Sequence, residues 1–115
     1  MTTISHAGAA LEPRTEAQEL EILRSRLDAI NLQLLSTLEA RGQIVQEVMA
    51  IKRRLGRPAY DPERERIMME TLLRRAADVY PRAALEQVFK AIFTASRALA
   101  IRSLTEAPSR QYHER

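Results

Sequence analysis

Several charged and hydroxyl side chains interrupt apolar helical stripes in this sequence. Arg41 takes a core position in a seven-residue apolar pattern, and Lys52, eleven residues further on, lies on nearly the same helical face. Glu65 precedes an apolar pair by one turn, and Ser96 continues an apolar line. Burying such groups is costly unless they find partners. Because arginine binds a carboxylate through two contacts and lysine supplies a compact charge, this set suits a small anionic ligand.

Each of these residues also has an ordinary structural explanation. An Arg41–Glu65 ion pair could set the helix register. A helical serine such as Ser96 often donates to the carbonyl of the preceding turn, and Asp61 fits a helix N-cap. Lys52 begins a basic helix end that would complement the helix dipole. The residues alone leave both interpretations open.

Three segments with helical spacing must position these residues. The first runs from about residue 16 to 55 with a coiled-coil-like repeat and ends at the Gly-Arg-Pro of residues 56–58. The second begins at an Asp-Pro pair, residues 61–62, and stops near Pro81; the third covers about residues 82–104. The sequence predicts an all-α fold with one long and two shorter helices. The residues expected to face inwards in the two shorter helices are Met68, Met69, Leu72, Ala76, Val79, Leu85, Val88, Phe89, Ile92, Phe93 and Leu99.

The chain of 115 residues allows one domain, predicted over residues 16–105, between a flexible N-terminal segment, 1–15, and a flexible C-terminal tail, 106–115. A 40-residue helix is roughly 60 Å long, whereas a compact chain of this size has a radius of gyration of about 13 Å. The long helix therefore overhangs its own domain. A second copy running antiparallel would cover its apolar stripe, which predicts a homodimer.

Composition excludes several other classes. There is no cysteine, and His6 and His113 lie far apart, so no thiolate or histidine metal site is expected. No apolar run is long enough to span a membrane, and a cytoplasmic protein is expected. A net charge of +3 from 18 basic and 15 acidic residues favours anionic ligands only weakly. A nucleic-acid binder using the basic residues 52–57 is disfavoured by this small excess and by the scarcity of aromatic residues.

The ordered set of these residues resembles the all-helical class of chorismate mutases over about residues 19–101. None of the short motifs is specific by itself, but their order, spacing and residue types together are specific to this class. The residues that carry the resemblance are Leu23-Arg24, Glu39-Ala40-Arg41, Lys52, Arg57-Pro58, Asp61-Pro62-Glu63-Arg64-Glu65-Arg66 and Ser96.

The resemblance implies an intertwined antiparallel helical homodimer with two equivalent sites. The implied reaction is the intramolecular rearrangement of chorismate to prephenate, a step towards phenylalanine and tyrosine, without cofactor, metal or covalent intermediate. It implies catalytic roles for Arg41, Lys52 and Glu65. The implied substrate-binding set is Arg24 of the other protomer, Arg41, Lys52, Asp61, Arg64, Glu65 and Ser96.

Helix geometry supports a shared site. Arg24 and Arg41 are seventeen residues apart, or roughly 25 Å along a helix, too far to contact one small substrate from the same straight helix. If two long helices pair antiparallel about Leu35, Arg24 of one chain lies opposite position 46 of the other, between Arg41 and Lys52. We therefore expect Arg24 to act across the interface.

One position departs from the family pattern. Where the family commonly carries a glutamine that shares the ether oxygen with the lysine, this sequence has Ala100. The isolated protein is then expected to be slow, to recruit Arg97 or a water, or to depend on a partner enzyme of the same pathway. Two alternatives stay open: an isochorismate-pyruvate lyase on the same scaffold, and a non-catalytic or partner-activated regulatory module that binds chorismate or prephenate.

Overall fold

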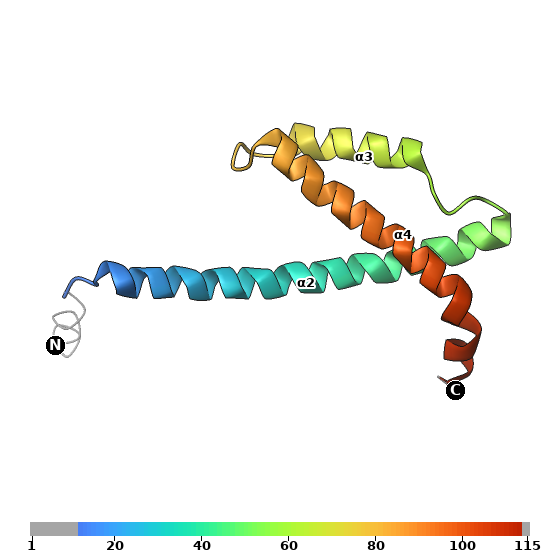
Figure 1. Cartoon of the computed structure of the whole chain (residues 1–115), viewed down its shortest axis with the longest axis horizontal. Helices are drawn as coiled ribbons and strands as arrows, with labels where there is room; N and C mark the ends of the chain where they lie inside the picture. The colour runs from blue at the N-terminus through green and yellow to red at the C-terminus, as the bar shows by residue number, and fades with distance from the viewer. Residues whose placement is uncertain (1–11, 114–115) are drawn as a thin grey trace, which may run out of the picture. The chain divides into compact units, whose positions relative to one another are not determined.

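The computed structural model describes the backbone of residues 12–113 and the side chains of residues 12–100. This part of the chain forms three helices and no strand: α2 (Glu16–Leu55), α3 (Pro62–Arg75) and α4 (Arg82–His113) (Figure 1). The predicted all-α fold with one long helix is confirmed. The chain divides into two compact units along its length, one ending at Leu38 and one beginning at Glu39.

Both ends of α2 carry the hydrogen bonds that helix boundaries require. Thr15 and Gln18 form a capping box, because the Thr15 amide donates to Gln18 Oε1 at 2.9 Å and the Gln18 amide donates to Thr15 Oγ1 at 3.0 Å. At the other end Gly56 has a φ of 69°, and the Arg57 amide donates to the Lys52 carbonyl at 2.8 Å. This is a Schellman motif, in which glycine takes the left-handed conformation. The predicted bounds of the long helix are therefore confirmed.

Helix α3 begins as predicted but ends early. The Asp61 side chain accepts a hydrogen bond from the Arg64 amide at 3.1 Å, and Pro62 occupies the first helical position. The helix ends at Arg75, and Ala76 is extended with a ψ of 140°. The prediction that it continues to Tyr80 is wrong. Ala76 and Val79, expected to face inwards, consequently lie outside the helix and are exposed.

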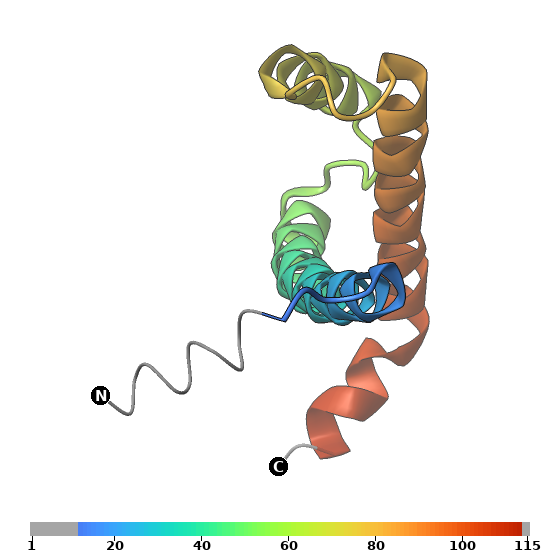
Figure 2. The ribbon, with the colours of Figure 1, turned by 90° about the vertical axis from the view of Figure 1, so that its left-hand side faces the viewer.

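Helices α3 and α4 form a hairpin joined by the loop of residues 76–81 (Figures 1 and 2). The Pro81 carbonyl accepts hydrogen bonds from the Ala84 and Leu85 amides and starts α4. This helix extends to His113, beyond the predicted end at residue 104. Residues 1–11, most of the predicted flexible N-terminal segment, lie outside the described residues together with His6. The flexibility of residues 106–115 stays a prediction.

A small apolar core lies in the unit that begins at Glu39. Met69, Phe93 and Ala100 are buried, and the Phe89 and Phe93 rings lie 6.4 Å apart between centroids. At Gly42 of α2, a Cβ atom would lie 3.3 Å from Leu99 of α4, so the glycine permits a close approach of these two helices. Val88, also expected to face inwards, is 52% exposed because it lies at the edge of the α4 stripe.

Within residues 12–38, the apolar stripe of α2 is exposed. Nine large apolar side chains of this unit have exposed fractions between 40% and 66%. They are Leu20, Ile22, Leu23, Leu27, Ile30, Leu32, Leu34, Leu35 and Leu38. Extended apolar surface of this kind is typical of an interaction site. Separately, none of the described helices has a stretch long and apolar enough to cross a membrane.

Two neighbouring methionines of α3 test the position of this core. Met69 is 9% exposed and Met68 is 38% exposed. We expect Met69→Ala to lower the free energy of unfolding by about 2–5 kcal/mol, because it leaves a cavity, and Met68→Ala to lower it much less. Urea denaturation at one fixed protein concentration would measure both. Equal losses for the two variants would contradict the burial described above.

Candidate active site

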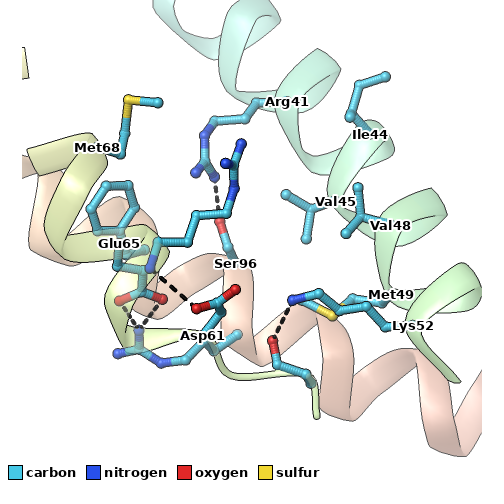
Figure 3. A pocket seen from close by; sticks show the side chains of 14 residues that line it. Arg41, Ile44, Val45, Val48, Met49, Lys52, Asp61, Glu65, Met68 and Ser96 are labelled. Carbon is cyan, nitrogen blue, oxygen red and sulfur yellow. Dashed lines mark hydrogen bonds and ion pairs between the residues drawn. The ribbon is translucent and has the colours of Figure 1, made fainter. Parts of the chain in front are cut away.

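A pocket with a volume of about 370 Å³ lies between the C-terminal part of α2 and the α3–α4 hairpin (Figure 3). This volume suits a small organic molecule. The described residues that line it are Arg41, Ile44, Val45, Val48, Met49, Lys52, Ala59, Asp61, Arg64, Glu65, Met68, Phe93, Ser96 and Arg97. The structure thus brings together six of the seven predicted site residues, all except Arg24. They come from three helices and from the loop that precedes α3.

Arg41 reaches from α2 towards α4 (Figure 3). Its Nη1 atom donates to Ser96 Oγ, and its guanidinium carbon lies 5.6 Å from the centre of the Phe93 ring. The Ser96 hydroxyl in turn donates to the Ile92 carbonyl at 3.0 Å. Ser96 therefore makes the ordinary back-bond of a helical serine and also orients Arg41. The predicted alternative of an Arg41–Glu65 ion pair is wrong, because each of the two side chains has another partner.

Lys52 lies one turn before the end of α2 and points into the pocket rather than along a solvated helix end (Figure 3). Its Nζ atom donates to the Ala59 carbonyl at 3.2 Å. Asp61 combines two roles, because it caps α3 through the Arg64 amide and also lines the pocket. The cap holds Asp61 and Arg64 at the same corner of the site.

Glu65 and Arg97 form an ion pair at the pocket wall. Arg97 Nη1 lies 2.7 Å from both carboxylate oxygens of Glu65, and the two side chains are 35% (Arg97) and 28% (Glu65) exposed. The Arg97 guanidinium also stacks on Tyr60, with its carbon 4.8 Å from the ring centre, and its Nη2 donates to Thr94 Oγ1 at 3.2 Å. Arg97 is therefore held on three sides.

The charges of the described lining residues are unbalanced. Four side chains are formally positive, Arg41, Lys52, Arg64 and Arg97, and two are negative, Asp61 and Glu65, which leaves +2. The remaining walls are largely apolar, and apolar walls strengthen the interaction of these groups with a bound anion. The arrangement can hold a small molecule that carries two carboxylates.

Arg24 belongs to the other unit of the chain. It is exposed and pairs with Glu21 one turn earlier, at 3.4 Å between Nη1 and Oε2. An exposed ion pair of this kind is easily exchanged for another partner. Its predicted role in the site stays a prediction.

Sequence reasoning missed the Glu65–Arg97 pair and the stacking of Tyr60. Arg97 follows Ser96 directly, so helical periodicity does not place both on one stripe, and Glu65 is 32 residues away. One signal was present: no basic residue lies three or four positions from Glu65, so its partner had to come from another element. Ala100, the departure from the family pattern, is buried and is not among the described residues that line the pocket.

On the same helix as Glu65, Arg66 forms ion pairs with Glu63 and Glu70. This Glu63–Arg66–Glu70 cluster lies on the exposed face of α3, and the described lining of the pocket includes none of its members. The hydrogen bond and the charge of Arg66 hold the pKa of Glu63 below its usual value. The cluster therefore offers matched control positions on the same helix.

Comparison with known proteins identifies relatives of this chain. The sequence matches the family described as chorismate mutase type II over residues 23–101. It is 33% identical over 86 residues to a bifunctional chorismate mutase/prephenate dehydratase of Aquifex aeolicus (strain VF5), which covers 71% of this chain and 24% of that protein. It is 34% identical over 79 residues to the T-protein of Enterobacter agglomerans, covering 68% and 21% of the two chains. The chain spans at most about a quarter of the length of these curated relatives.

Solved structures with the same fold are matched over nearly their whole length. Chorismate mutase (form II) of Thermus thermophilus is 36% identical with a TM-score of 0.72, over 73% of this chain and 96% of that chain. Chorismate mutase of Helicobacter pylori, solved in complex with prephenate, is 28% identical with a TM-score of 0.72, over 77% and 97%. The resemblance inferred from the site residues is thereby confirmed, and the chain belongs to the chorismate mutase type II family.

Proposed function

We propose that this chain catalyses the rearrangement of chorismate to prephenate. The observation that carries the proposal is the pocket in which Arg41, Lys52 and Glu65 converge, with a formal excess of two positive charges among the described lining residues. Chorismate is a dicarboxylate, so its charge complements this excess. Membership of the chorismate mutase type II family supports the same substrate.

The rearrangement is intramolecular, so the enzyme contributes positioning and electrostatic stabilisation. Arg41, oriented by Ser96, would bind one carboxylate through its guanidinium fork. Lys52 would donate to the ether oxygen, where negative charge develops as the C–O bond breaks. Its present acceptor, the Ala59 carbonyl at 3.2 Å, holds the ammonium group at the pocket. The charge at Lys52 stabilises the transition state more than the ground state, which is what raises the rate.

The side-chain carboxylates of the protein would bind the hydroxyl end of the substrate. Glu65 and Asp61 both line the pocket and accept hydrogen bonds, while Arg64 supports that corner from the first turn of α3. A carboxylate has about four acceptor directions. Glu65 can therefore accept from a substrate hydroxyl while it stays paired with Arg97.

We further propose that the site is completed by Arg24 of a second protomer in an intertwined antiparallel homodimer. Nine exposed large apolar side chains between residues 12 and 38 support the dimer, because a lone chain would leave them in water. The placement of Arg24 opposite position 46 in an antiparallel pair supports its role. The fused enzymes among the relatives support association with another enzyme of the pathway.

Alanine variants of the two α2 cations test the reaction. We expect Arg41→Ala and Lys52→Ala each to lower kcat/KM for chorismate by roughly 10²–10³-fold, because each removes a preoriented cation. Arg53→Ala, an exposed position outside the described pocket lining, is the matched control and should stay near wild type. A continuous assay of chorismate disappearance, with products identified by chromatography, measures this.

This assay, a stability measurement with prephenate and a pyruvate assay with isochorismate together separate the alternatives. Wild-type protein that consumes chorismate no faster than the variants, at the uncatalysed rate, would refute the mutase proposal. Stabilisation by prephenate without turnover would instead indicate a binding module. Release of pyruvate from isochorismate as the faster reaction would indicate the lyase.

Subunit mixing tests the shared site. Arg24→Ala and Arg41→Ala dimers should each be nearly inactive, but after exchange half of the dimers are mixed and carry one intact site of two. Recovery to about a quarter of wild-type activity is therefore expected. A mixture of Arg41→Ala and Lys52→Ala should recover nothing, since both residues act in the same chain's pocket. Absence of recovery in the first mixture, after mass spectrometry has verified exchange, would contradict the proposal.

A further inference from the structure

Among the cations of the described pocket lining, Arg97 has the most protein partners: a carboxylate, a hydroxyl and an aromatic ring, whereas Arg41 has a hydroxyl and an aromatic ring. The Nη1 atom of Arg97 contacts both oxygens of Glu65 at 2.7 Å, its Nη2 donates to Thr94, and its face lies on Tyr60. Arg41, by comparison, donates to a single hydroxyl, and Lys52 to a single carbonyl. Three of the five N–H donors of Arg97 are therefore used within the protein.

This geometry bears on the missing donor at position 100. Ala100 is buried and has no polar side-chain atom, so it cannot assist Lys52. If Arg97 moved away from Glu65 to replace such a donor, a partly buried carboxylate would be left without its cation. The contacts favour a different role for Arg97.

We infer that Arg97 is a positioning residue that fixes the carboxylate of Glu65 for substrate binding, and that Tyr60 in turn holds Arg97. This inference rests on the proposed function of the pocket. A glutamate side chain without a fixed partner samples several rotamers, and ordering it costs free energy when a ligand binds. The Arg97 contact orders Glu65 before the substrate arrives.

The support of Arg97 comes from two separate elements. Tyr60 lies in the loop before α3, next to the capping residue Asp61, and Thr94 lies one turn earlier on α4. A guanidinium over an aromatic face is attracted by the ring and keeps its plane fixed. The Tyr60 contact therefore ties the Asp61–Arg64 corner of the pocket to the α4 wall that carries Ser96.

A double-mutant cycle in catalysis tests the inference. Arg97→Met keeps the length of the side chain and removes its charge, and we expect it to lower kcat/KM for chorismate by on the order of 10–100-fold. In a Glu65→Gln background, the same Arg97→Met change should cost less than about threefold, because the carboxylate that it positions is gone. Multiplicative losses would show that Arg97 acts on the substrate by itself and would overturn the inference.

Conservative and control variants separate positioning from folding. One nitrogen makes the contact to both Glu65 oxygens, so Arg97→Lys should regain part of the activity that Arg97→Met loses. If Arg97→Lys is as poor as Arg97→Met while both unfold at the wild-type urea midpoint, the inference fails. Arg66→Met, which breaks the exposed Glu63–Arg66–Glu70 cluster, is the matched control and should leave kcat/KM unchanged.

The proposed function is tested by the wild-type protein alone. If wild type neither turns over chorismate nor binds prephenate by calorimetry, the proposed function fails first. If wild type is active and Arg97→Met equals it, only the positioning role of Arg97 fails. The two failures are thus distinguishable.

Discussion

Several positive side chains line one small pocket, and their mutual repulsion decides which partners each of them needs. At an effective dielectric constant of about 20, two like charges about 6 Å apart repel each other by roughly 3 kcal/mol. Each cation of the pocket therefore needs a local partner while no anion is bound. The structure supplies one for three of them: the Ser96 hydroxyl for Arg41, the Ala59 carbonyl for Lys52 and the Glu65 carboxylate for Arg97.

These partners hold their cations with different strengths. The difference distinguishes the cations that bind a ligand from the cation that supports the site. A single neutral acceptor such as a hydroxyl or a carbonyl is readily exchanged for a carboxylate of the ligand. The partly buried Glu65–Arg97 pair is not exchanged at similar cost. Arg41 and Lys52 can thus exchange their present acceptors for groups of a ligand, whereas Arg97 stays paired with Glu65 at the pocket wall.

Local sequence patterns were enough to predict the three helices and the polar positions of the pocket. The Gly56 ending and the Asp61 cap are local hydrogen-bond patterns, so short-range spacing was enough to predict these two helix boundaries. The polar interruptions at Arg41, Lys52 and Glu65 also stood out, because a charge on an apolar stripe needs an explanation. The predicted end of α3 at Tyr80 was wrong, since no glycine or proline marks the observed end at Arg75.

The pairing of the charged groups could not be predicted from the sequence, because it follows from how the helices pack. Several arginines in the sequence could form an ion pair with Glu65, and helical periodicity favours Arg41 no less than Arg97. The choice of Arg97 depends on where α4 passes α3 and on the Tyr60 ring that holds the guanidinium, and both follow from packing between segments distant in the chain. Periodicity states which face a residue occupies, whereas pairing depends on distances between faces, which exist only once the helices are packed.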